Sequence, residues 1–221
     1  MALPPILDVF LHVDKHLQNV IDHYGTGVYA VLAAIVFCET GLVFLPFLPG
    51  DSLLFAAGAF AARGSLDVAV VFVLLTAAAI LGDTVNYSIG VMLGPKLAAK
   101  GKLPFVKQKH LDETHKFYEK YGPKTIVLAR FVPIVRTFAP FVAGVGSMKY
   151  STFMKYNVVG AIAWAAVCVG AGYFFGNLEF VQKRFELVIL AIIFVSIIPI
   201  VVGYLRERSS RRAEGAKQPS A

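Results

Sequence analysis

Charged residues are scarce in this chain of 221 residues. Asp, Glu, Lys and Arg make up 16% of it, against 57% hydrophobic residues. A soluble domain carries about 25% charged residues, so the composition excludes an ordinary soluble fold and indicates a compact helical membrane domain. Cysteine is also scarce: Cys38 and Cys168 both lie in apolar segments, with no C-x-x-C spacing. Neither a disulfide framework nor a metal site is therefore expected.

Catalytic signatures are missing as well. The chain contains no G-x-S-x-G, no H-E-x-x-H and no Ser/His combination within its apolar segments, so we expect no enzyme, no cofactor and no metal. The N-terminus has no basic n-region of a signal peptide, and the chain itself is expected to be the membrane anchor. The net charge of +7 comes from basic residues beside apolar segments. This placement favours the positive-inside rule over nucleic-acid binding.

One apolar stretch, residues 124–144, contains two arginines and two prolines, Arg130, Pro133, Arg136 and Pro140. An arginine at the centre of a membrane helix costs roughly 2.5 to 3.5 kcal/mol, so it faces a protein interior or a wet cavity and is a candidate functional residue. Proline breaks a helix, which leaves two arms too short to cross a bilayer. We therefore predict a re-entrant hairpin over about 125–146, shaped by Pro133, Pro140 and Gly144.

A second re-entrant hairpin is predicted over about 28–63. Glu39 precedes a Pro-x-x-Pro-Gly turn and Asp51 follows it. A carboxylate inside an apolar helix is a functional candidate by default. The alternative for Asp51 is an ordinary helix cap within a structural hairpin. The residues expected to shape this turn are Pro46, Pro49 and Gly50.

Three longer apolar segments are predicted to span the membrane, at 68–94, 151–175 and 185–205. The first is interrupted by Asp83 and Asn86, which are three residues apart and share one helix face. These two are secondary site candidates, because a packing hydrogen bond and a substrate contact explain them equally well.

The remaining segments are polar or amphipathic. Residues 1–25 show apolar side chains at helical spacing and are predicted to form an amphipathic helix on the membrane surface. The lysine-rich connection 95–124 is predicted to be cytoplasmic, as is the C-terminus, where arginines follow the last span. The membrane domain would thus cover 26–206, followed by a disordered tail at 207–221.

With the lysine-rich connection inside, the two hairpins enter from opposite sides of the membrane. A shift of 82 residues supports an internal repeat, since it places residues 64–67 on 146–149 and two glycines of one spanning helix on two of another. We therefore predict an all-α integral membrane protein. Its core would be an inverted repeat of re-entrant hairpin plus transmembrane helix, with an N-terminal amphipathic helix and a C-terminal transmembrane helix. Secondary transporters use this plan. The glycines that the shift of 82 residues superimposes are Gly90 on Gly172 and Gly94 on Gly176.

Two segments of the chain carry specific motifs. They are residues 37–54, which run from Phe37-Cys-Glu39 through Leu-Pro-Phe-Leu-Pro-Gly-Asp51, and residues 129–144, which begin Ala-Arg130-Phe-Val-Pro-Ile-Val-Arg136. Together they resemble the DedA family of bacterial inner-membrane proteins, of the SNARE-associated or VTT type. The resemblance implies two opposed re-entrant hairpins and proton-motive-force-dependent transport of a lipid carrier, undecaprenyl phosphate. The family's acidic pair falls on Glu39 and Asp51, and its arginine pair on Arg130 and Arg136.

Three functions are weighed. The first is a flippase that recycles undecaprenyl phosphate and supports the envelope, with Arg130 and Arg136 holding the phosphate and with Glu39 and Asp51 carrying protons. The second is a proton-coupled exporter of cations or drugs. The third is a passive scaffold whose charges form only a structural network. The expected partners are a phospholipid or polyprenyl-phosphate lipid, protons and the membrane, with no nucleic acid, and a homo-oligomer remains open. The expected location is the bacterial inner membrane, in a multi-pass topology.

Overall fold

The computed structural model describes residues 17, 19, 21, 23–42, 50–100, 114–115, 118–183, 187–188 and 190–191. Within these residues every regular element is helical and none is a strand, as predicted. The elements in chain order are η1 (Gly25–Gly27), α3 (Val28–Gly41), α4 (Gly50–Ala62), α5 (Val68–Lys100), η2 (Gly122–Lys124), α7 (Thr125–Ala129), α8 (Pro133–Val145), α9 (Tyr150–Phe175) and α10 (Glu179–Lys183).

Two helices are long and apolar enough to cross a membrane. They cover Val68–Gly94 in α5 and Tyr150–Phe175 in α9, with 27 and 26 residues. At 1.5 Å per residue each is about 40 Å long, more than the ~30 Å hydrocarbon core requires. Helix α5 continues to Lys100, past the predicted end at residue 94.

Several predicted features lie outside the described residues. They include most of the N-terminal amphipathic helix, most of the third span, most of the connection between α5 and η2, and the C-terminal tail. Pro46 and Pro49 of the first predicted turn are among them. The re-entrant hairpins and their orientation in a membrane stay predictions.

The chain between α7 and α8 changes direction at the residue before a proline. Helix α7 ends at Ala129, and Val132 adopts an extended conformation with φ −125° and ψ 103°. Steric contact with the ring of a following proline favours that conformation. Pro133 then occupies the first position of α8, where its missing N–H group would have had no helical partner. The break sets the two arginines of this stretch on different elements.

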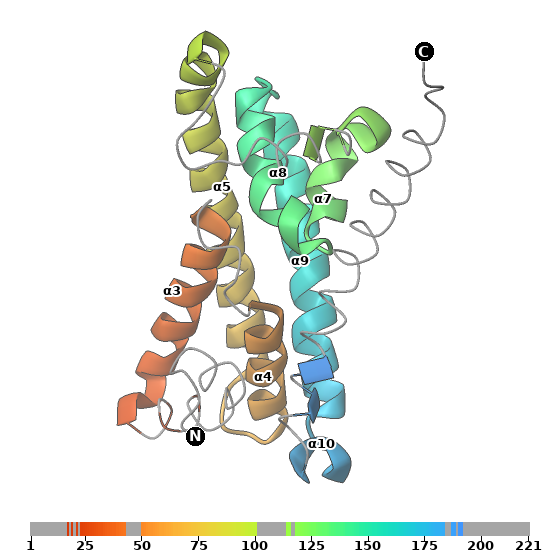
Figure 1. The fold of residues 1–221 in the computed structure, drawn as a ribbon. Coiled ribbons are helices and arrows are strands. Elements are labelled where there is room, and N and C mark those ends of the chain that lie inside the picture. The colour runs from red at the N-terminus through yellow and green to blue at the C-terminus, as the bar shows by residue number, and fades with distance from the viewer. Residues whose placement is uncertain are drawn as a thin grey trace, which may run out of the picture.

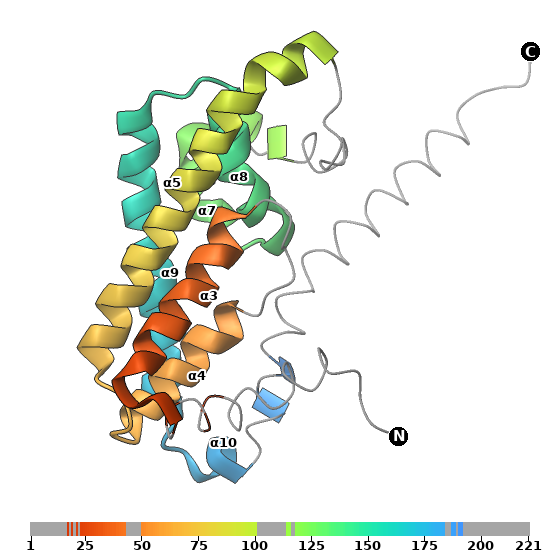
Figure 2. The same cartoon turned by 90° about the vertical axis from the view of Figure 1, so that its left-hand side faces the viewer.

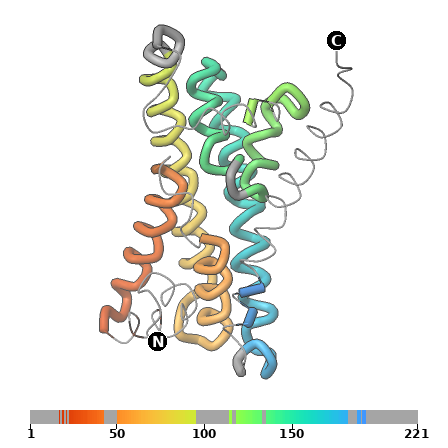
Figure 3. The backbone as a smooth tube through the Cα atoms, in the orientation of Figure 1, coloured from red at the N-terminus to blue at the C-terminus, as the bar shows by residue number. Residues whose placement is uncertain are grey.

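The two short-helix pairs lie toward opposite ends of the two long helices. In Figures 1 and 2, α3 and α4 lie beside the lower part of the bundle and α7 and α8 beside the upper part. The backbone trace in Figure 3 shows α5 and α9 running through both levels. Each long helix therefore contacts elements from both halves of the chain, and α3 contacts both α4 and α8.

Helix α8 packs closely on α5 through two glycines. A Cβ atom on Gly90 of α5 would overlap the backbone carbonyl group of Phe141, and one on Gly144 of α8 would overlap the carbonyl oxygen of Tyr87. Without side chains at these positions the two backbones can approach each other, as in membrane helix pairs that use small residues. The glycines thus fix how deeply α8 enters the bundle.

Helix α4 makes the reciprocal contact with α9. A Cβ atom on Gly172 of α9 would overlap the carbonyl oxygen of Phe55, and one on Gly58 of α4 would overlap that of Val169. The contact therefore repeats the α5–α8 contact, with the same F-x-x-G sequence on the short helix: residues 55–58 in α4 and 141–144 in α8. The short helix α4 of the first half therefore packs on the long helix α9 of the second half, and α8 of the second half packs on α5 of the first.

Candidate functional site

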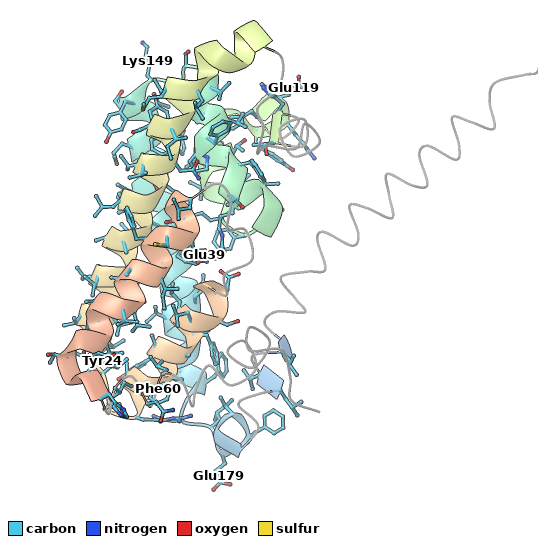
Figure 4. The ribbon with its side chains drawn as sticks, turned by 60° about the vertical axis from the view of Figure 1, so that its left-hand side comes forward. Tyr24, Glu39, Phe60, Glu119, Lys149 and Glu179 are labelled. Atoms are coloured by element: carbon cyan, nitrogen blue, oxygen red, sulfur yellow. The ribbon has the colours of Figure 1, made fainter. Side chains whose placement is uncertain are left out.

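Arg136 joins the two carboxylates of the first predicted hairpin. Its Nη1 donates a hydrogen bond to Oδ1 of Asp51 at 2.7 Å, and its Nη2 donates to Oε1 of Glu39. Arg136 lies on α8, Glu39 near the end of α3 and Asp51 at the start of α4. Figure 4 places Glu39 at about mid-height in the bundle. One guanidinium therefore connects three elements that are distant in sequence.

Gly50 allows this arrangement to form. A Cβ atom at Gly50 would fall on the carboxylate of Glu39. With any other residue at the first position of α4, the Glu39 carboxylate would have to move from this position. Leu54 and Ala56 of the same helix are fully buried, so α4 is held by packing and has little freedom to make room in another way.

Arg130 forms a second charged cluster. Its Nη2 donates to Oδ2 of Asp83 at 2.5 Å and to Oδ1 of Asn157 at 2.6 Å. Asn157 in turn donates from Nδ2 to the carbonyl oxygen of Ile80 at 3.1 Å. The side chains of Arg130 and Asp83 are 1% and 4% exposed. Two donors of Arg130, Nε and Nη1, have no hydrogen-bond partner among the described residues.

Trp164 lies between the two clusters. Its Nε1 donates to Oδ1 of Asp51 at 2.8 Å. Its ring centroid lies 5.2 Å from Cζ of Arg136 and 5.9 Å from Cζ of Arg130, within the range of cation–π attraction. The indole is 1% exposed, and it is the chain's one tryptophan. It therefore contacts both arginines and one of the carboxylates.

Asn86 donates its hydrogen bonds to backbone carbonyl groups and not to the charged side chains. Its Nδ2 donates to the backbone carbonyl oxygens of Thr40 at 3.1 Å and of Thr137 at 2.9 Å. These bonds tie α5 to the end of α3 and to α8. Of the two secondary candidates, Asp83 therefore lies on an arginine, whereas Asn86 bonds to two backbones, and its buried Oδ1 has no hydrogen-bond partner among the described residues.

The four main candidates and Asp83 thus meet in two adjacent clusters. Two site residues were not predicted, Asn157 and Trp164. Trp164 had a signal in the sequence, because a lone tryptophan lies in the middle of an apolar helix and its N–H group needs a partner there. Among the described residues, no group of three His, Cys, Asp or Glu side chains is placed to hold a metal ion.

The charges of the site do not cancel if every group is ionised. Two arginines face three carboxylates, Glu39, Asp51 and Asp83, which leaves one negative charge. Oε2 of Glu39 is buried and has no hydrogen-bond partner among the described residues. Uptake of one proton would neutralise the site, and a second proton would leave it positive. The site can therefore change from repelling an anion to attracting one by gaining protons.

Buried charges at the centre of an apolar bundle, with two helices of membrane-spanning length, define a helical membrane protein with a polar core. The chain belongs to the VTT-domain or DedA family, since the family model for the VTT domain matches residues 48–174. It is 53% identical to protein DedA of Escherichia coli K12 over 211 residues, which cover 94% of this chain and 96% of that protein.

More distant relatives carry membrane names as well. The chain is 42% identical over 220 residues to the uncharacterized membrane protein Rv0364 of Mycobacterium tuberculosis H37Rv, covering 99% of this chain and 94% of that one. It is 33% identical over 180 residues to the inner membrane protein YghB of Escherichia coli K12, covering 81% of each. No solved structure matches the chain.

Proposed function

We propose that the protein is a multi-pass bacterial inner-membrane flippase that recycles undecaprenyl phosphate and depends on the proton motive force. The observation that carries this proposal is the pair of arginines buried mid-bundle, Arg130 and Arg136, whose side chains are 1% and 11% exposed. A phosphate group that crosses a low-dielectric region needs charged donors there. A guanidinium can bind two phosphate oxygens at once. The protein acts as a carrier and makes or breaks no covalent bond.

Protons would enter through the carboxylates. In the described arrangement Arg136 is occupied by Glu39 and Asp51, so it cannot bind a phosphate with the same N–H groups. Protonation of a carboxylate weakens its hold on the guanidinium, because a neutral acid loses the charge–charge attraction. A proton gradient can therefore control when Arg136 is available. This gives a physical link between proton movement and lipid movement.

A proton-coupled exporter of cations or drugs is the second candidate. The observation that favours it is the excess of one carboxylate over the arginines, since an anionic site attracts a cation. In that case the carboxylates bind the substrate and the arginines neutralise them between cycles. The phosphate-lipid proposal is preferred because two arginines would be a costly choice inside a cation pathway.

The test is transport by purified protein in proteoliposomes. A short-chain fluorescent undecaprenyl phosphate is incorporated, and its movement between leaflets is followed with and without an imposed pH gradient. We expect protein-dependent movement that the gradient accelerates. Protection of the purified protein against heat separates the two candidates, because a ligand raises the melting temperature of the state that binds it. Stabilisation by an amphipathic cation but not by the phosphate lipid would reject the flippase proposal in favour of the exporter.

A further inference from the structure

The two charged clusters differ in how accessible they are. Asp51 and Arg136 have side chains that are 25% and 11% exposed, whereas Arg130 and Asp83 are 1% and 4% exposed. An incoming ligand therefore meets the Asp51–Arg136 pair before it meets Arg130. An anion that binds Arg136 at Nη1 must replace Oδ1 of Asp51, which holds that position at 2.7 Å.

Replacement leaves Asp51 as a carboxylate beside a second anion in an apolar interior. Loss of one partner from a buried ion pair is strongly unfavourable, unless other hydrogen bonds remain. Oδ1 of Asp51 already accepts a second hydrogen bond, from Nε1 of Trp164 at 2.8 Å. This bond does not involve Arg136, and it can persist when Arg136 turns to a ligand.

Trp164 also contacts Arg136, the other member of the Asp51–Arg136 pair. Its ring lies 5.2 Å from Cζ of Arg136, so the arginine keeps a cation–π partner after it releases Asp51. The indole is attached to α9, where Ala161 and Ala165 beside it are fully buried. A side chain packed in this way is fixed in position, so it can hold both groups while they separate.

We propose that Trp164 is a positioning residue that retains Asp51 when the phosphate group of a polyprenyl lipid replaces it on Arg136. The proposal rests on the function proposed above. It assigns the indole N–H a role in ligand exchange that a purely packing role does not include. A packing role would need only the volume of the ring.

The experiment compares binding in four proteins: the wild type, Trp164→Phe, Asp51→Asn and the double variant. Each full chain is purified in detergent, and the dissociation constant of farnesyl phosphate is measured, with farnesol as the control that lacks the phosphate. Phenylalanine keeps an aromatic ring over Arg136 but has no N–H donor. The indole N–H bond exists with and without the ligand, but it stabilises the Asp51 carboxylate more strongly once Arg136 has left that carboxylate. We therefore expect Trp164→Phe to bind farnesyl phosphate up to about tenfold more weakly, within the range for a hydrogen bond to a charged group.

The Asp51→Asn background distinguishes the proposed role from packing. Asparagine is neutral and competes only weakly with phosphate for Arg136, so it does not need the indole to hold it. We expect Trp164→Phe to change binding by less than about twofold in that background. Equal weakening in both backgrounds would overturn the proposal, as would unchanged binding in Trp164→Phe alone.

A second measurement covers the case in which Trp164→Phe does not fold. Because the chain has one tryptophan, a tryptophan auxotroph grown on benzothienylalanine replaces the indole N–H by sulfur at this site alone and keeps the ring shape. The same tenfold weakening is expected, and wild-type affinity would reject the role of the N–H group. If the wild type binds farnesyl phosphate no better than farnesol, the proposed function itself fails. Tight wild-type binding with no effect at Trp164 rejects only the further inference.

Discussion

Substitution of Asp83 by asparagine removes one charge from the site and little else. The amide oxygen can still accept the hydrogen bond from Nη2 of Arg130, which is now 2.5 Å from Oδ2. The guanidinium, however, would lose its carboxylate partner while its side chain stays 1% exposed. Two of its donors already have no partner among the described residues. We expect the free energy of unfolding to fall by roughly 3 to 5 kcal/mol, which is the usual cost of removing one partner of a buried ion pair.

The assay is reversible unfolding of the purified protein in mixed micelles, followed by circular dichroism as the denaturing detergent increases. Asp67→Asn is the matched control. Asp67 is exposed, and its Oδ1 accepts hydrogen bonds from the N–H groups of Ala69 and Val70 at the start of α5. An asparagine there keeps this cap, so we expect a loss below about 1 kcal/mol.

A double variant separates charge balance from packing. Leucine at position 83 combined with methionine at position 130 removes both charges, and buried ion pairs replaced by apolar side chains often recover stability. We expect Asp83→Leu with Arg130→Met to be more stable than Asp83→Asn yet inactive in transport. If Asp83→Asn unfolds with the same free energy as the wild type, the carboxylate does not balance Arg130 and our account of this cluster is wrong.

Three further predictions concern topology and transport. A cysteine in place of Lys107 should label only from the cytoplasm and one in place of Ser65 only from the periplasm, and labelling of both from one side would contradict the inverted repeat. Lysine in place of either arginine keeps the charge but loses the planar fork; transport should fall while the protein stays folded in the membrane, and normal transport in both variants would favour simple charge neutralisation. Glu39→Gln and Asp51→Asn should keep the thermal shift on ligand binding but lose acceleration by a pH gradient. A scaffold role predicts unfolded variants instead, and a full gradient response in both would exclude them as proton carriers.

The sequence predicted the helical membrane class and both described spans, because hydropathy over about 20 residues is a local property. It did not predict which charges would pair. Asp83 and Arg130 are 47 residues apart, and only the crossing of α5 with the arginine segment brings them together. The sequence alone therefore favours Glu39 and Asp51 over Asp83, although the structure places Asp83 directly on an arginine.

The sequence indicates only part of the internal repeat for a similar reason. A shift of 82 residues aligns the glycines of α5 and α9, but the F-x-x-G sequences of α4 and α8, at 55–58 and 141–144, are offset by 86. Helix α4 continues for four residues after Gly58, whereas α8 continues for only one after Gly144, and the following connection is one residue longer in the first half, so no single shift aligns both. The reciprocal contacts of these glycines become visible only in three dimensions.

The crossed contacts also affect how the chain is made. Helix α4 is complete at residue 62, but its partner surface on α9 includes Gly172, which is synthesised about 110 residues later. At the usual 5 to 20 residues per second, α4 waits roughly 6 to 20 seconds for the helix that covers it. Until α8 is synthesised, the Asp51 carboxylate at the start of α4 has neither Arg136 of α8 nor Trp164 of α9 as a partner. A chain that ends before α9 would therefore lack the surface on which α4 packs.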